Sequence, residues 1–108
     1  MTVKPDALDE FAALIRDAVA DDQAAEPNSQ IIECFIDGQD AQFCERYQDA
    51  AAALAHLQRF GQYYASRVFA VCTPGRMTVY GEPSDDVRAA LDAFSPRYLE
   101  PLAGFARS

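Results

Sequence analysis

The sequence predicts a single α+β domain, and three observations carry this prediction. Residues 6–24 and residues 49–72 carry apolar side chains at three- and four-residue spacing, which is typical of amphipathic helices. Residues 30–36 and 41–47 are rich in side chains that favour strands, and a short turn separates them. At Asp49 the spacing of side chains that share one face changes from two residues, as in a strand, to three or four, as in a helix. A strand therefore leads directly into a helix.

The length and composition indicate one domain with its own core. The chain has 108 residues, half of them hydrophobic, which suffices for one core but not for two. We expect residues 82–108 to add a C-terminal helix and a docking tail. No run of about 18 apolar residues, the length of a membrane span, is present, and no apolar signal core opens the chain. We therefore expect a cytoplasmic protein without a membrane partner.

Charge and cysteine content argue against a nucleic-acid-binding protein and against a disulfide-framework or zinc-binding protein. The formal charge is −8, and residues 1–50 contain three basic and twelve acidic groups. Such a surface repels phosphate backbones, so we expect no nucleic-acid partner. Cys34, Cys44 and Cys72 are an odd number without a C-x-x-C pair. They indicate free thiols in a reducing compartment rather than a disulfide framework or a zinc site.

The first predicted helix covers residues 6–24. Leu8, Phe11 and Ile15 recur on one face, and Asp6 is placed to cap the first turn. The segment Glu26-Pro27-Asn28-Ser29 ends the helix.

The two strand-like stretches form a predicted hairpin. With Gly38 and Gln39 as its turn residues, Ile32 faces Glu45, Cys34 faces Phe43 and Ile36 faces Ala41. Cys34 and Cys44 then point to opposite faces of the sheet, so they cannot form a disulfide.

Both faces of this hairpin carry large apolar side chains. Ile31 and Phe35 lie on one face, and Ile32, Ile36 and Phe43 lie on the other. One helix layer covers a single face, and the chain is too short for a second full layer. A second copy of the chain is the simplest cover for the open face, so we expect a homodimer.

The second predicted helix begins after Asp49, a suitable N-cap residue. Residues 67–72 are compatible with a helix or a strand, and periodicity alone does not decide between the two. The apolar stripe continues through them, so we favour a helix that is bent or broken near Gly61. A turn at 73–76, a short strand at 77–80 and a helix capped by Ser84 follow. The last stretch, from Arg97, is expected to be irregular or helical and to dock through its apolar side chains on the core or on the partner.

The junction between the hairpin and the second helix resembles a known family. A strand ends in Glu45-x-Tyr47, a polar turn at Asp49 follows, and an Ala/Leu helix start at Leu54 leads to His56. This arrangement is similar to the antibiotic-biosynthesis-monooxygenase family, and the resemblance covers residues 3–80.

The resemblance implies both a fold and an activity. The fold is a ferredoxin-like β-α-β-β-α-β unit whose sheet packs against that of a second copy to close a dimeric α+β barrel, here with an extra C-terminal helix and tail. The implied activity is a monooxygenase reaction, without cofactor or metal, on an aromatic substrate such as a quinol or a polycyclic phenol. Two departures stand out. Only three residues precede Lys4, where the family has a longer first strand, and the chain lacks the tryptophan that haem-degrading relatives use.

His56 and Glu45 are the candidate catalytic residues. His56 is the single histidine of the chain, and its intrinsic pKa suits a general base. The alternative is a half-exposed helix histidine without a role, and the helix stripe places it at the border of an aromatic cleft rather than deep in the core. Glu45 on an apolar strand face is a second candidate base, or else a structural acceptor that fixes the turn into the helix.

The candidate substrate-binding residues are mostly aromatic. They are Tyr47, Phe60, Tyr63, Tyr64, Arg67 and Tyr80. Ordinary core packing for the aromatic side chains, and a surface ion pair for Arg67, are the alternatives.

Two functions therefore remain. The first is a cofactor-independent monooxygenase in which His56 or Glu45 removes a phenolic proton. The second is a non-catalytic dimeric module that binds a ligand or serves as structure. A cavity above roughly 300 Å³ where His56, Glu45 and two tyrosines converge favours the first function, and a filled core favours the second.

Overall fold

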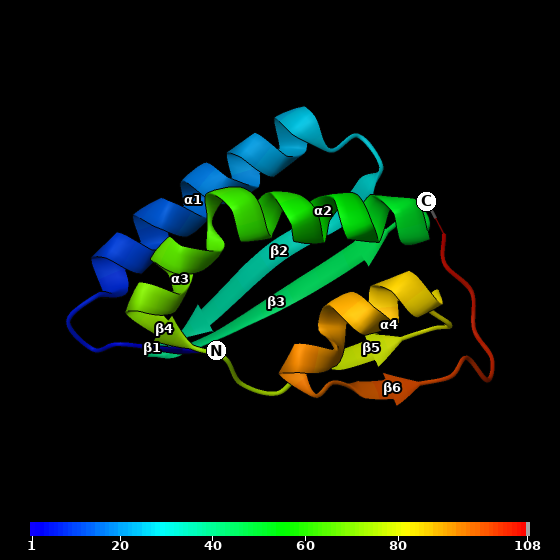
Figure 1. Ribbon diagram of the computed structural model, residues 1–108. Helices are drawn as coiled ribbons and strands as arrows, with labels where there is room; N and C mark the ends of the chain where they lie inside the picture. The colour runs from blue at the N-terminus through cyan, green and yellow to red at the C-terminus, as the bar shows by residue number, and fades with distance from the viewer. Residues whose placement is uncertain (108) are drawn as a thin grey trace.

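A four-stranded antiparallel sheet forms the base of the molecule, and helices cover one of its faces (Figure 1). This computed structural model describes residues 1–107. The strand order is β2-β3-β1-β4, and every neighbouring pair is antiparallel. The strands are β1 (Thr2–Val3), β2 (Ser29–Asp37), β3 (Asp40–Tyr47) and β4 (Cys72–Thr73). The predicted α+β class is confirmed.

Three helices form the layer above this sheet. They are α1 (Leu8–Ala25), α2 (Ala50–Tyr63) and α3 (Ala65–Val71). Figure 1 shows α1 and α2 lying across the β2–β3 hairpin, with α3 above the short strands β1 and β4. The core between the layers is centred on Val3, Phe11 and Val68, whose side chains are almost completely buried. Among residues 1–107, no helix is both long enough and apolar enough to span a membrane.

The predicted hairpin register is confirmed at three positions. Ile32 pairs with Glu45, Cys34 with Phe43 and Ile36 with Ala41. Gly38 has φ 58°, a left-handed conformation that glycine adopts without steric cost, and this permits the two-residue turn. The three cysteines are free thiols, as predicted.

The predicted N-cap residues are correct for two helices and wrong for a third. Asp49 accepts a hydrogen bond of 2.9 Å from the Ala52 N–H, and Ser84 accepts one of 3.3 Å from the Val87 N–H, so both predicted caps are confirmed. The predicted cap at Asp6 is wrong, because α1 begins at Leu8 after an Ala7 without a capping side chain.

The second predicted helix is broken at Tyr64 instead of near Gly61. Tyr64 leaves the helical conformation at φ −128°, and its hydroxyl donates a hydrogen bond of 2.9 Å to Asp21 on α1. Residues 65–71 are helical, which confirms the preference for helix over strand, while Cys72 belongs to β4.

A small β-α-β unit follows the main sheet. It consists of β5 (Thr78–Tyr80), α4 (Asp85–Leu91), a 3₁₀ turn η1 (Asp92–Phe94) and β6 (Arg97–Leu99), and β5 pairs with β6 in parallel. The expectation of an irregular or helical segment from Arg97 is therefore wrong over its first three residues. Ser95, with φ 50°, ends η1 and redirects the chain toward β5, a partner that local sequence does not reveal.

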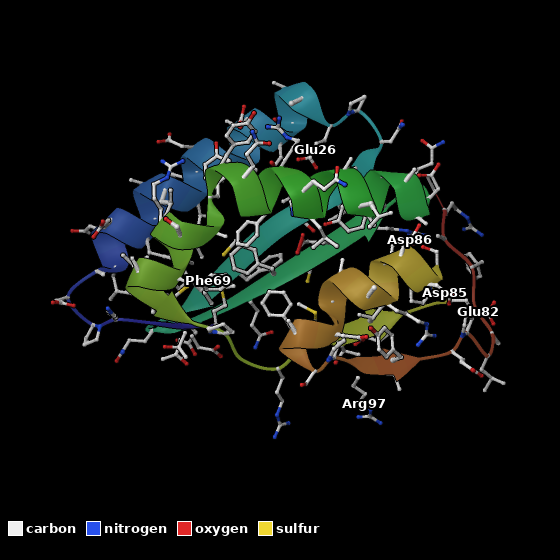
Figure 2. The ribbon with its side chains drawn as sticks, viewed as in Figure 1. Glu26, Phe69, Glu82, Asp85, Asp86 and Arg97 are labelled. Carbon is white, nitrogen blue, oxygen red and sulfur yellow. The ribbon has the colours of Figure 1, made fainter. Side chains whose placement is uncertain are left out.

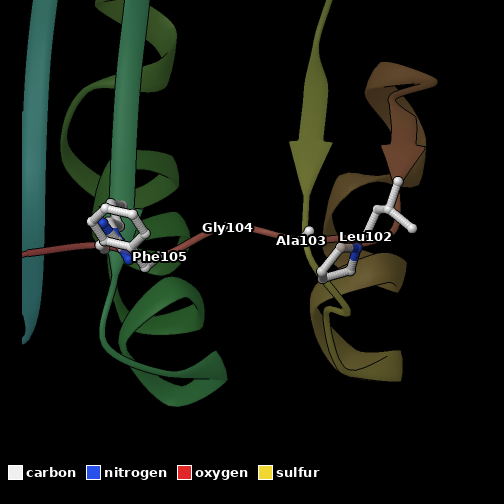
Figure 3. Close-up of a pocket in the computed structure, with 7 residues that line it drawn as sticks. Leu102, Ala103, Gly104 and Phe105 are labelled. Carbon is white, nitrogen blue, oxygen red and sulfur yellow. The ribbon is translucent and has the colours of Figure 1, made fainter.

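The last residues leave this unit as an extended tail. In Figure 3 the tail runs from β6 across to β3, where the Phe105 ring lies over the strand. Leu102 and Phe105 are 99% and 83% exposed, so the tail does not dock on the chain's own core.

Helices leave the second face of the sheet uncovered. Phe35 on this face is 57% exposed and Ile31 is 37% exposed. The predicted two-sided apolar hairpin is therefore present. The chain covers one side of it except near the turn, where Ile36 is 54% exposed.

Candidate functional site

His56 lies buried between two carboxylates that come from different elements. Its Nε2 is 2.9 Å from Oε1 of Glu45 on β3, and its Nδ1 is 2.9 Å from Oε1 of Glu26 after α1. The residue is 8% exposed, so the expectation of a half-exposed position is wrong. His56 is buried by tertiary packing, because the C-terminal end of α1 and the edge of the sheet lie against this part of α2.

Backbone geometry brings the three residues together. Glu45 faces Ile32 across the hairpin on the helix-covered side of the sheet. Asp49 caps α2 two residues after β3 ends, so His56, about two turns along, faces back toward Glu45. Glu26 is the C-cap residue of α1, and its N–H donates to the Asp22 carbonyl. Figure 2 labels Glu26 at this end of α1, close to α2.

Glu26 is held on both of its carboxylate oxygens. Oε1 accepts hydrogen bonds from the Ser29 hydroxyl at 2.8 Å and from His56, and Oε2 accepts one from Arg59 Nε at 3.1 Å. Arg59 also donates to Asp21 at 2.8 Å. A carboxylate with this many donors remains charged although its side chain is only 4% exposed.

Tyr47 completes the site on the Glu45 side. Its hydroxyl donates to Glu45 Oε1 at 2.5 Å, and its ring lies 5.5 Å from the His56 ring at a tilt of 42°. The side chain of Glu45 is 34% exposed, whereas those of His56 and Glu26 are 10% and 4% exposed. Glu45 is therefore the member of the site that a molecule from solvent can reach.

The electrostatics favour a charged imidazole. Burial disfavours the imidazolium, but hydrogen bonds and negative charge from Glu45 and Glu26 outweigh it and raise the pKa of His56 to about 9. Burial raises the pKa of both glutamates, but their hydrogen bonds hold it below the ordinary value. At neutral pH both ring nitrogens of His56 therefore carry protons, and neither has a free lone pair to act as a base.

Asp22 is the third carboxyl group around His56. It lies one helical turn before Glu26, is 7% exposed, and has Oδ2 3.8 Å from His56 Nδ1. Burial, a hydrogen bond with Glu26 and the charge of Glu26 raise the pKa of Asp22 to about 7. Sequence reasoning missed Asp22, Glu26 and Arg59. The four-residue spacing of Asp22 and Glu26, at the end of a helix without basic residues in its last turn, was the available signal.

Metal binding is chemically possible for part of this cluster. One ligand atom each from Asp22, Glu26 and His56 lies within 4.8 Å of the other two. However, His56 Nδ1 is hydrogen-bonded to Glu26, and the Arg59 guanidinium lies beside the same carboxylate. We therefore describe Asp22, Glu26, Glu45, His56 and Arg59 as a charge cluster that is held together by hydrogen bonds and ion pairs.

The predicted substrate-binding residues do not converge on this site, apart from Tyr47. Phe60 packs edge-on against Phe69, which in turn contacts Phe94; Figure 2 labels Phe69 on α3 beside other aromatic rings. The Arg59 and Arg67 guanidinium groups lie over the Tyr63 and Tyr64 rings, respectively. Tyr80 is 79% exposed on the separate small sheet. Any catalytic or substrate-binding role of the predicted residues stays a prediction.

Two cavities lie next to the hairpin. One, of about 480 Å³, is lined by Arg46 and by tail residues 101–106 (Figure 3). The other, of about 400 Å³, lies between α1 and β2, and its wall includes Asp22, Gln23, Ser29 and Gln30. Neither of these two cavities is lined by His56, Glu45 or a tyrosine. The second cavity adjoins the charge cluster, because Asp22 belongs to both.

Comparison with known proteins identifies the fold. No protein-family model matches the chain, and a search of curated proteins found no significant match. Among solved structures, the crystal structure of MupZ from Pseudomonas fluorescens is similar, with a TM-score of 0.85 and 24% sequence identity. The similarity covers 98% of this chain and 88% of MupZ. At this identity the likeness concerns the fold.

Proposed function

We propose that this chain is a small acid–base enzyme that removes a proton from a phenol or quinol and oxidises it with dioxygen, without a cofactor. The observation that carries the proposal is the position of Glu45. It is a partly exposed carboxylate that two donors hold in place, next to a buried and charged histidine. General acid–base groups are typically placed and tuned by such partners.

The base in this proposal is Glu45, and His56 supports it. A carboxylate beside an imidazolium is a weak base, because a proton on Glu45 forfeits the attraction between the two charges. This changes if the Nδ1 proton of His56 moves toward Glu26 and Asp22 while Glu45 takes the substrate proton. The imidazole is then neutral, and a protonated Glu45 is no longer penalised. The proton affinity of Glu45 thus depends on the carboxylates on the far side of the ring.

The oxidation follows from the anion that proton removal creates. A phenolate or quinolate is a far better electron donor than its protonated form, so it can pass an electron to dioxygen. The phenoxyl and superoxide radicals combine to form a C–O bond at a ring carbon that carries hydrogen, and Glu45 returns its proton to the peroxide. Loss of the ring hydrogen with cleavage of the O–O bond then releases water and leaves a carbonyl group on the product. Tyr47, whose ring packs near His56 and whose hydroxyl donates to Glu45, offers an aromatic surface beside this carboxylate.

The proposed enzyme is a homodimer with a ferredoxin-like topology. The order of the first strands and helices and the sheet order β2-β3-β1-β4 support the β-α-β-β-α-β assignment, with β1 and β4 reduced to two residues each. The exposed Ile31 and Phe35 support a second copy on the open sheet face, as in a dimeric α+β barrel.

Oxygen uptake with a panel of quinols and polycyclic phenols tests the proposal. Glu45→Gln removes the base but keeps the size of the side chain, so turnover should fall by about two to four orders of magnitude. Glu82→Gln, an exposed change of the same kind between β5 and α4, is the matched control and should leave turnover unchanged. Turnover that survives Glu45→Gln overturns the role of Glu45, and no uptake by the wild type overturns the enzyme.

The second candidate function is a non-catalytic module of the same fold. It is favoured by the two cavities, because neither is lined by Glu45 or His56. On this view the charge cluster is a structural device that joins α1, α2 and β3. The module predicts no uptake by the wild type, and binding of an aromatic ligand, if any, that Glu45→Gln leaves unchanged.

A further inference from the structure

The charge cluster continues beyond the residues that the proposed function uses. On one side of His56, Glu45 and Tyr47 lie toward the partly exposed edge of the site. On the other side, Glu26 is 2.9 Å and Asp22 is 3.8 Å from Nδ1. The imidazole therefore has a proton-accepting carboxylate on each nitrogen.

Access to solvent differs between the two inner carboxylates. Glu26 has hydrogen-bond donors on both oxygens and a side chain that is 4% exposed. Asp22 instead lines the cavity of about 400 Å³ between α1 and β2, which is large enough for several water molecules. Nδ1 is hydrogen-bonded to Glu26, which in turn shares a hydrogen bond with Asp22. A proton that leaves Nδ1 can therefore pass Glu26 and reach water through Asp22.

We propose that Asp22 is the proton-exchange residue of this site, linking the buried Nδ1 of His56 to water in the α1–β2 cavity. This extends the proposed function, because it supplies the route by which the proton displaced from His56 leaves when Glu45 takes up another. Asp22 acts through His56 and is not placed to touch a substrate at Glu45.

The surroundings of Asp22 suit this role. The charged groups that face it are Glu26 on its own side of the site and His56 and Arg59 on α2, and Glu33 on β2 lines the same cavity. With a pKa of about 7, Asp22 releases and accepts protons equally well near neutral pH. Its neighbour Asp21 is hydrogen-bonded to Arg59 and Tyr64 instead and does not line the cavity.

Nuclear magnetic resonance of the single histidine tests this proposal without a substrate. With ¹⁵N-labelled histidine, the exchange of the Nδ1–H and Nε2–H protons with water is measured separately. In Asp22→Asn, exchange at Nδ1–H should slow by about a hundredfold, the lower end of what a positioned proton-transfer group contributes. Exchange at Nε2–H, which faces Glu45, should stay within about twofold of the wild type.

Asp17→Asn is the matched control, because it removes the same charge from an exposed position of α1 that contacts neither the cavity nor the hydrogen bonds of the site. It should leave both exchange rates as in the wild type. An unchanged Nδ1–H rate in Asp22→Asn overturns the proposal, as does an equal slowing at both nitrogens, which reports a general tightening of the site.

The wild type alone provides a second test in case Asp22→Asn does not fold. The Nδ1–H exchange rate should change with pH around a midpoint near 7, the pKa of Asp22, and the Nε2–H rate should not share this midpoint. A Nδ1–H rate without that midpoint overturns the proposal. These results are independent of oxygen uptake, so failure of the exchange route is distinguishable from failure of the proposed activity.

Discussion

Glu26 and His56, thirty residues apart in the chain, share a buried hydrogen bond of 2.9 Å between Oε1 and Nδ1. This contact joins the end of α1 to the middle of α2. Together with the bond from His56 Nε2 to Glu45, it ties both helices to β3 through one imidazole. The cluster is thus a structural link as well as the proposed acid–base site.

Substitution of His56 should destabilise the protein. The hairpin-and-helix pattern alone predicts that His56→Ala costs little, but the buried position revises this expectation. Removal of the imidazole leaves Glu26 without one of its donors and Glu45 without its charge partner, so we expect a loss of about 2–4 kcal/mol in unfolding free energy. Urea denaturation at pH 7 measures it. Gln58→Ala, an exposed change on the same helix, serves as the control and should shift stability by less than about 0.5 kcal/mol.

Stability should fall as the pH rises through the pKa of His56. The folded protein raises this pKa from 6.5 to about 9, so the folded state holds the proton more tightly than the unfolded state. The contribution is fully present below pH 6.5 and is lost as the pH passes about 9. A shift of this size corresponds to on the order of 3 kcal/mol.

Denaturant titrations at pH 6, 7, 8 and 9 check this dependence. His56→Gln removes the titrating group, so the difference in unfolding free energy between wild type and variant should shrink over the same range. A difference that stays constant from pH 6 to 9 contradicts the raised pKa.

The open sheet face should mediate dimerisation. Phe35→Asp places a charge on the exposed apolar face, where burial against a second copy is costly, so the variant should be a monomer of 11.9 kDa. Sedimentation equilibrium at micromolar concentration measures the mass. Tyr80→Asp introduces the same charge at an exposed aromatic residue of the small sheet and should leave the dimer intact. A wild-type protein that sediments as a monomer rules out the dimer.

Local sequence sufficed for the parts of the fold that depend on neighbours in the chain. The hairpin register follows from the two turn residues at Gly38 and Gln39, and Asp49 and Ser84 cap helices through contacts three residues away. Strand β6 escaped prediction because its partner, β5, lies on the far side of a helix. A parallel pairing of this kind leaves no turn signature between its strands.

The sequence predicted some residues of the candidate site and missed others. Glu45 and His56 were identified because both lie at one strand–helix junction. Glu26 and Asp22 were missed because their contacts with His56 depend on how α1 packs on α2, which no spacing within either helix encodes. The same packing explains why His56 is buried, since α1 covers the face of α2 that periodicity placed at the border of the core.

The protonation state of His56 tests the central claim most directly, and the chain's single histidine makes its ¹⁵N signals unambiguous. A pH titration of the two ring nitrogens from pH 5 to 10 reports that state. The cluster of Glu45, His56 and Glu26 predicts an imidazolium with protons on both nitrogens at pH 7.5 and a midpoint near 9. A neutral imidazole at pH 7.5, with a midpoint near 6.5, would contradict the charge cluster and the acid–base mechanism built on it.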